Sequence, residues 1–326
     1  MLMIEHRDQP ARPYNPSTMA KVIDYNATLV ARQDLTPALA IFTIRCDDEL
    51  TDFVPGQYMT IGMNNEEVPD LGSVRRPMSI ASAPRDTDGR EFYIRYVGKP
   101  ESDNPLTHLL WQAKPGDRLY LRPKAVGHFT VTHTVGDLDP RLRVTVAAGT
   151  GLAPFLSMVR AEVQKDPDVS LSRWAILHGA SYPADLGYRD ELEALQEKNG
   201  LVYGATISRP NEAPDWQGDV GRVEDYFLPE RLPELEKRLG LEVGGLQPDK
   251  AVIYICGLQG TIGETLMRLV SRGYVPDNKR VRRALEVADD VPATLFFEQY
   301  DTTPVIPIHD EEEMARLRSE LHAAIA

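Results

Sequence analysis

In the first part of the chain, hydrophobic and polar residues alternate in short runs. Turn residues separate these runs from one another at short intervals. This rhythm is typical of strands with one buried face and predicts a small antiparallel β-barrel or sandwich. One helix is expected within it, at Pro105–Gln112, with Asn104 as its N-cap. The predicted strands are Val22–Ala31, Leu39–Arg45, Gln57–Met63, Pro77–Ala81, Phe92–Val97, Arg118–Leu121 and His128–Val131.

From Arg143 onward, the pattern changes to continuous hydrophobic runs that alternate with amphipathic helical segments. This order predicts a parallel sheet that helices cover on both faces. In the last helix, Thr261 and Glu264 have the spacing of a capping box, and Gly273 suits the C-terminal end. The predicted strands are Arg143–Ala148, Trp174–Gly179, Leu201–Ile207 and Val252–Cys256, and the helices lie near Phe155–Gln164, Arg189–Lys198 and Gly263–Arg272.

The two ends of the chain depart from these patterns. The first residues have no hydrophobic rhythm and are typical of a flexible lead-in. Thr294–Tyr300 is a final β-like run, and Asp310–Ala326 has the charged helical pattern of an appended surface helix. The predicted organisation is a lead-in over 1–20, an antiparallel β-barrel domain over 21–136, an α/β parallel-sheet domain over 137–300 and an extension with a helix over 301–326.

Composition restricts the possible functions. The 326 residues include 36 basic and 49 acidic ones, and the net charge of −13 argues against nucleic acid and anionic membranes as general partners. No apolar run approaches the length of a membrane span and no signal core is present, so a cytoplasmic location is expected. Two cysteines, Cys46 and Cys256, cannot hold an iron–sulfur cluster or a cysteine-rich zinc site, and the histidines lack metal-ligand spacing. We therefore expect no metal, and any redox centre must be organic.

A glycine turn lies between the first strand and the first helix of the second pattern. Gly149, Thr150 and Gly151 allow close approach of the backbone to a ligand, and Pro154 suits the first turn of a helix. Such a turn directs N–H groups and the positive end of the helix dipole toward a phosphate or a carbonyl. The alternative is an ordinary connection between a strand and a helix.

A second candidate site lies in the first pattern, at Arg75–Pro84 (RRPMSIASAP). Arg76, Met78 and Ser79 could serve one flat ligand with a phosphate tail, although an edge strand with an exposed arginine would look the same. The later segment Asn104–Thr107 could hold a pyrophosphate on the N–H groups of its helix, or it could be a simple capped helix.

Five motifs in order, RPMSIAS, NPLTHLL, GTGLAPF, SRP and YICG, resemble the ferredoxin–NADP reductase superfamily, and within it the bacterial ferredoxin or flavodoxin reductases. The resemblance covers about Lys21 to Tyr300. It implies that the barrel is an FAD-binding domain and that the α/β domain binds NAD(P).

For the flavin, the resemblance implies that Arg76 binds the pyrophosphate and that Ser79 lies near N5. Met78 departs from the aromatic residue that usually covers the ring, and its thioether is expected to cover the flavin with weaker stacking. Tyr300 would shield the flavin, or it could be a core aromatic residue. The implied flavin residues are Arg76, Pro77, Met78, Ser79, Arg95, Tyr96, Val97, Pro105, Leu106, Thr107 and Tyr300.

For the nicotinamide nucleotide, the resemblance implies NADP rather than NAD, because Arg209 and Arg222 suit a 2′-phosphate. Ser181 stands where related reductases often have another arginine, so the preference should be smaller. Cys256 would lie beside the nicotinamide, but a buried core cysteine is the alternative. The implied residues are Gly149, Thr150, Gly151, Pro154, Ser208, Arg209, Arg222, Cys256 and Gly257.

The resemblance thus implies an enzyme in which Ser79, Cys256 and Glu298 are catalytic. NADPH would deliver a hydride to flavin N5, and the electrons would pass singly to ferredoxin or flavodoxin. An acidic carrier needs a local basic surface. Arg75, Arg76 and the group Lys279, Arg280, Arg282 and Arg283 are candidates, unless the second group is only a solvated face.

Two other functions stay open at this point. The same scaffold could be a reductase component of an oxygenase, or it could reduce free flavin or ferric ligands. It could also be a non-catalytic electron-transfer or regulatory subunit, although Arg209, Cys256 and the glycine turn argue against this.

Overall fold

The computed structural model describes residues 21–49, 51–299 and 303–325. Within them, the first half of the chain forms a six-stranded antiparallel sheet in the order β4-β3-β6-β1-β2-β5. A bridge between Ile80 and Phe92 joins the end of β4 to β5 and closes the sheet into a barrel. The strands are β1 (Ala27–Thr36), β2 (Leu39–Cys46), β3 (Tyr58–Asn64), β4 (Ser73–Ser79), β5 (Arg90–Arg95) and β6 (Arg118–Leu121).

Helix α1 (Leu106–Gln112) covers one end of this barrel, and η1 (Pro69–Leu71) precedes β4. The predicted N-cap of α1 is wrong: the helix begins after Pro105, and the Asn104 side chain contacts Leu71 O and Asn65 instead. The predicted strand at His128–Val131 is also wrong. There the Thr130 hydroxyl accepts a hydrogen bond from the backbone N–H of His133 and starts a short helix, α2 (Val131–Thr134).

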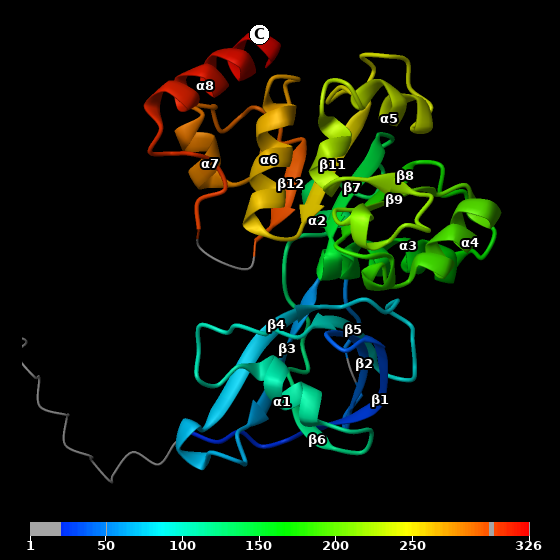
Figure 1. Cartoon of the computed structure of the whole chain (residues 1–326), viewed down its shortest axis with the longest axis vertical. Coiled ribbons are helices and arrows are strands. Elements are labelled where there is room, and N and C mark those ends of the chain that lie inside the picture. Colours follow the sequence, from blue (N-terminus) through cyan, green and yellow to red (C-terminus); the bar gives the residue numbers. More distant parts are fainter. Residues whose placement is uncertain (1–20, 50, 300–302, 326) are drawn as a thin grey trace, which may run out of the picture.

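The second half forms a six-stranded parallel sheet in the order β10-β9-β8-β7-β11-β12 (Figure 1). The predicted fold class, an antiparallel barrel followed by an α/β parallel sheet, is confirmed. The strands are β7 (Leu142–Ala148), β8 (Trp174–Ala180), β9 (Val202–Ile207), β10 (Asp219–Val220), β11 (Ala251–Cys256) and β12 (Leu295–Glu298). The helices are α3 (Ala153–Lys165), α4 (Arg189–Asn199), α5 (Leu232–Arg238), α6 (Gln259–Val270), α7 (Lys279–Ala284) and α8 (Glu311–Ile325), with short helices η2 (Gly149–Leu152), η3 (Pro183–Asp185), η4 (Pro210–Glu212) and η5 (Val223–Phe227).

Helices cover both faces of the parallel sheet, as alternate strand residues show. Ile253 and Ile255 of β11 belong to the core shared with α5, α6 and α8, whereas Tyr254 belongs to the core shared with α3 and α4. The predicted capping box is wrong, because α6 already begins at Gln259 and Thr261 is buried inside it. Both faces of the sheet are therefore filled, and ligands can reach its strands only at their ends.

The C-terminal helix is not a loosely attached surface helix. Met314, Leu317 and Leu321 of α8 are buried in the core that includes α6, and Arg318 donates a hydrogen bond to the carbonyl of Ala284 at the end of α7. The segment before it also packs closely, because a Cβ on Gly263 would lie 2.4 Å from Val305 O. The extension is thus an integral part of the second half.

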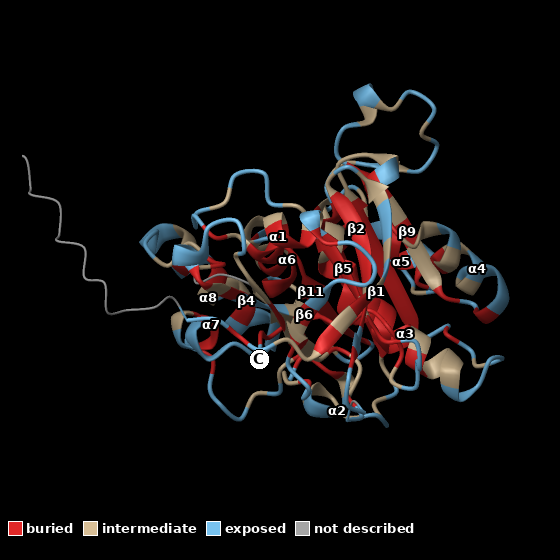
Figure 2. Cartoon of the chain, turned by 90° about the horizontal axis from the view of Figure 1, so that it is seen from below, coloured by how far each residue is buried: buried red, intermediate tan, exposed pale blue. Residues whose placement is uncertain are grey.

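The barrel and the parallel sheet share a half-buried, polar contact around Arg160 of α3. Its guanidinium donates to Glu91 Oε2 of β5 at 3.0 Å and to Glu191 Oε2 of α4 at 2.6 Å. Nearby, the Tyr93 hydroxyl donates to Asp185 O and accepts from the N–H of Gly187. Residues of β2 and β5 that are buried, shown red in the view from below (Figure 2), belong to the same apolar core as residues of α3 and α4. Charged and hydrogen-bonded side chains therefore join the two halves at fixed positions.

Candidate active site

A cavity of about 650 Å³ opens where the barrel meets the carboxyl ends of the parallel strands. Its barrel side is formed by the end of β4, the end of β5 and the start of α1, which the closing bridge between Ile80 and Phe92 brings together. The opposite side is formed by Thr150, Ala153 and Leu258, which follow β7 and β11. The site is therefore built from both halves of the chain.

The flavin residues that the sequence predicts come together in this cavity. All ten that fall within the described residues line it, and Tyr300 lies outside the described residues. The ten are Arg76, Pro77, Met78, Ser79, Arg95, Tyr96, Val97, Pro105, Leu106 and Thr107.

The end of β5 is fixed to α1 by hydrogen bonds at both backbone groups of Val97. Its N–H donates to the Thr107 hydroxyl at 3.2 Å, and its carbonyl lies 2.9 Å from His108 Nε2. The Tyr96 and His108 rings stack with centroids 4.6 Å apart. These contacts fix the cavity wall, and they give Thr107 and His108 structural tasks in addition to any contact with a ligand.

Ser79 and Glu298 meet across the boundary between the halves. The Ser79 hydroxyl donates to Glu298 Oε2 at 3.2 Å. Burial raises the pKa of Glu298 to about 7, and the hydrogen bond from Ser79 opposes this shift. In the ladder between β11 and β12, Glu298 is the direct partner of Cys256. The three residues predicted to be catalytic therefore lie within one small region, and one of them can exchange a proton near neutral pH.

The glycine turn rests on the end of β11. A Cβ on Gly151 would lie 2.0 Å from the carbonyl oxygen of Cys256, and one on Gly257 would lie 2.8 Å from the Cβ of Ala148. Gly149 has a positive φ of 55°. The turn forms η2 and leads into α3, whose first turn contains Pro154. Only glycine fits at position 151, and this close contact sets where Thr150 points into the cavity.

Cys256 itself is fully buried among Tyr254, Phe296 and Ala147. This agrees with the alternative of a core cysteine, and contact between its thiol and a nicotinamide stays a prediction.

The residues expected to bind the 2′-phosphate lie at the ends of β8, β9 and β10. The backbone N–H groups of Ser208 and Arg209 donate to the carbonyls of Ala180 and Ser181, which joins the loops after β8 and β9. Arg209 Nη1 donates to the Tyr182 hydroxyl at 2.7 Å and lies 3.8 Å from Glu212.

Arg222 lies two residues after β10 and its side chain is 71% exposed, with Glu224 3.7 Å away. Both ion pairs are long, and the side chains of Arg209 and Arg222 are 57% and 71% exposed, although Glu224 is buried. Both guanidinium groups are therefore open to solvent and available to a phosphate.

Several residues of the site were missed by the sequence analysis. Leu258 is 76% exposed at the cavity mouth, directly after the YICG motif, and Tyr182 contacts Arg209. Buried Asp185 lies 3.4 Å from Arg95. The position of Leu258 directly after the YICG motif was a visible signal for it, whereas Asp185 and Tyr182 are brought to the site only by the tertiary fold.

Two further observations concern the described residues only. They contain no group of three or more histidine, cysteine, aspartate or glutamate side chains that could hold a metal ion. None of their helices is long and apolar enough to cross a bilayer.

Comparison with known proteins matches residues 145–265 to the oxidoreductase NAD-binding domain. Ferredoxin–NADP reductase B of Sorangium cellulosum is 33% identical over 258 residues, which cover 78% of this chain and 94% of that protein. Methane monooxygenase component C of Methylosinus trichosporium is 37% identical over 180 residues, or 55% of this chain and 47% of that protein. The crystal structure of a ferredoxin NADP+ reductase from Neisseria gonorrhoeae with bound FAD and NADP has a TM-score of 0.66 at 22% identity, covering 85% of this chain and 98% of that one.

The sequence similarity to the reductase from Sorangium cellulosum extends over most of that protein. It therefore includes both the barrel that carries the cavity and the parallel sheet that carries the glycine turn. The chain belongs to the ferredoxin/flavodoxin–NADP reductase superfamily and is an oxidoreductase of this FAD- and NADP(H)-binding family.

Proposed function

We propose that this enzyme moves electrons between NADPH and a one-electron carrier protein, ferredoxin or flavodoxin. The observation that best supports this proposal is the contact between Ser79 and Glu298, because a carboxyl group with a pKa of about 7 then lies beside the cavity at the junction of the two halves. The similarity to a ferredoxin–NADP reductase over 94% of its length supports the choice of acceptor.

The cavity suits FAD in shape and chemistry. It has the volume of a typical cofactor site, apolar walls and an exposed arginine, Arg76, in the middle of β4. Arg76 would hold the pyrophosphate, Met78 would cover the ring, and the Ser79 hydroxyl would face its reactive edge. When bound, FAD accepts a hydride from NADPH and releases the electrons one at a time.

The chain's own residues supply the proton chemistry and orient the nucleotide. With a pKa of about 7, Glu298 is poised to take up or release a proton through the Ser79 hydroxyl near neutral pH. Arg209 and Arg222 would exchange their long contacts with glutamates for the 2′-phosphate of NADP(H). The glycine turn at 149–151 would seat the nicotinamide end.

A carrier protein would dock on basic residues near the cavity. Arg75 and Arg76 are exposed on β4, and Lys279, Arg280 and Arg283 are exposed on α7. Arg282 is removed from this group, because its guanidinium is buried and donates to the backbone carbonyls of Pro276, Ala288 and Val291. Arg280 lines a second cavity together with Phe297 of β12, so α7 lies close to the strand that ends in Glu298.

An anaerobic titration of the FAD-loaded protein with NADPH, followed by absorbance, tests the hydride step. Bleaching of the flavin is expected, and absence of bleaching by both NADPH and NADH would favour a non-catalytic subunit. Rates with ferredoxin, flavodoxin and free flavin then test the acceptor. Turnover with free flavin alone would refute a carrier protein as acceptor.

A second candidate is the reductase component of an oxygenase. It is favoured by the 37% identity to component C of a methane monooxygenase, although that match covers only 47% of the other protein. Two cysteines cannot ligate a cluster within this chain, so a separate carrier would still be needed. Turnover with an oxygenase component in the absence of ferredoxin and flavodoxin would select this alternative. A cytoplasmic location stays a prediction.

A further inference from the structure

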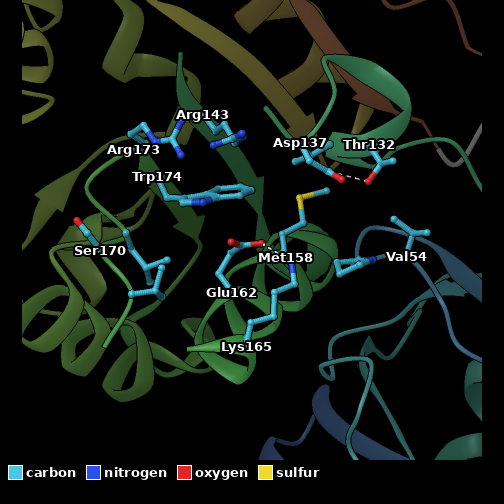
Figure 3. A pocket seen from close by; sticks show the side chains of 14 residues that line it. Val54, Thr132, Asp137, Arg143, Met158, Glu162, Lys165, Ser170, Arg173 and Trp174 are labelled. Atoms are coloured by element: carbon cyan, nitrogen blue, oxygen red, sulfur yellow. Dashed lines mark hydrogen bonds and ion pairs between the residues drawn. The ribbon is translucent and has the colours of Figure 1, made fainter. Parts of the chain in front are cut away.

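A separate cavity of about 240 Å³ lies at the other end of the parallel sheet (Figure 3). Arg143 and Trp174, at the amino ends of β7 and β8, line it together with residues of α3 and the barrel loop at Val54. The predicted nucleotide residues lie at the carboxyl ends of the same sheet. This cavity is therefore distinct from the active site, although α3 connects the two: Ala153 lines one and Met158 the other.

Arg143 is a buried cation with few partners. Its side chain is 5% exposed, and its guanidinium lies over the Trp174 ring, 5.2 Å from the centroid. Nη2 donates to the carbonyl of Asp139 at 3.1 Å, whereas Nε is buried and meets no acceptor among the described residues. A buried guanidinium normally has a carboxylate or another anion as partner, because its charge is costly to remove from water.

A second arginine converges on the same point. Arg173 is exposed, and its Nη1 also donates to the carbonyl of Asp139 at 3.1 Å. Two positive groups therefore share one neutral acceptor. Neither forms an ion pair within the described part of the chain. Burial, and after it repulsion by Arg173, lowers the pKa of Arg143.

The carboxylates near these arginines are engaged elsewhere. Asp139 accepts hydrogen bonds from Arg141 at 2.6 and 3.0 Å. Glu162, which lines the cavity, pairs with Lys165 at 3.0 Å. The other carboxylate in the wall, Asp137, accepts a hydrogen bond from Thr132 at 2.8 Å.

We propose that this cavity binds a small phosphate-type oxyanion, held by Arg143 and Arg173. Guanidinium groups match phosphate geometry with paired N–H donors. The Nε of Arg143 is buried without a partner among the described residues, so the cost of burying this cation is only partly offset, and an anion beside the guanidinium would offset it further. The volume is below that of typical drug-sized sites, so the ligand is inorganic phosphate or a short phosphomonoester and not a nucleotide.

Isothermal titration of the FAD-loaded full chain, with excess NADP+ present to occupy the nucleotide site, tests the proposal with inorganic phosphate and with sn-glycerol 3-phosphate. Saturable binding of either probe at millimolar concentration is expected, and the tighter probe identifies the source of the phosphate group. Arg173→Gln should weaken binding about tenfold or more, since it removes a charged donor. Arg122→Gln, an exposed arginine on the barrel, is the matched control and should change nothing.

A second measurement does not depend on variants of the buried arginine. The ¹⁵N NMR signal of an arginine Nε–H should shift on addition of the probe, and Arg143→Gln should remove that signal if the variant folds. Absence of saturable binding by both probes would overturn the proposal. Binding that Arg173→Gln leaves unchanged would also overturn it, because the anion would then lie elsewhere.

Discussion

Replacing Glu298 by glutamine should remove a pH dependence whose sign depends on the direction of electron flow. The carboxyl group has a pKa of about 7 and reaches the cavity through the Ser79 hydroxyl. When NADPH reduces a carrier protein, the hydrogen of the transferred hydride must leave as a proton, which the ionised carboxylate can accept. In the reverse direction the protonated acid must supply that proton.

The pKa of Glu298 determines how strongly the rate depends on pH. With a value of about 7, roughly a tenth of Glu298 is ionised at pH 6 and roughly nine tenths at pH 8. The proton-dependent rate should therefore rise about tenfold over this interval in the direction from NADPH to carrier, and fall about tenfold in the reverse direction. Loss of a positioned acid or base costs about a hundredfold or more in rate, so Glu298→Gln should be slow and should lose the inflection near pH 7.

Ser79→Ala is a control for which the direction of the pKa change can be predicted. Its hydrogen bond stabilises the ionised carboxylate, so its loss should move the inflection to higher pH, by about one unit. The assay is kcat/KM in both directions from pH 5.5 to 9, together with flavin content and the melting temperature of each variant. The reasoning fails if the inflection near pH 7 persists in Glu298→Gln, or if both directions show the same slope.

Three further predictions concern the nucleotide site and the fold. Arg209→Ala should lower the ratio of kcat/KM for NADPH over NADH about tenfold or more, because a charged hydrogen bond to the 2′-phosphate is lost, and an unchanged ratio would place the phosphate elsewhere. Gly151→Ala should raise KM for NADPH and lower the melting temperature, since the added Cβ would lie 2.0 Å from a backbone carbonyl of β11. Gly260→Ala in α6, whose Cβ would meet no atom from outside its own stretch of helix within 4 Å, should keep the wild-type KM and should not lower the melting temperature. Arg282→Gln should lower the free energy of unfolding by at least about 2 kcal/mol, because it removes charged hydrogen bonds to three carbonyls, whereas exposed Arg283→Gln should have little effect in the same urea titration.

Much of the flavin cavity could be predicted because its residues lie in compact motifs. Arg76–Ser79 and Pro105–Thr107 are short continuous segments, and a closed barrel leaves few places where the two can lie. Strand β6 matches its predicted limits for a similar reason: its hydrophobic alternation is interrupted sharply by turn residues on both sides.

The errors arose where a side chain meets the backbone of a distant segment. Asn104 contacts Leu71 instead of capping a helix, and Thr130 starts a helix in a segment whose sequence pattern predicts a strand. Helix α7 was missed because its basic sequence resembles a solvated face, and the partners of Arg282 become neighbours only in the folded chain. The unpartnered Nε of Arg143 leaves no trace in sequence, because an arginine next to a buried strand usually finds a carboxylate.

The polar contact around Arg160 bears on how substrates come and go. In enzymes that open by a hinge, few strong contacts cross the gap between the moving parts. Here Arg160 joins Glu91 of the barrel to Glu191 of the second half, and Tyr93 is bonded to the loop before α4. Opening the two halves would break several charged hydrogen bonds at once in each catalytic cycle. We therefore expect the separation between the two cofactor rings to be a fixed property of the fold, and nucleotide exchange to depend on small movements at the cavity mouth, where Leu258 lies exposed.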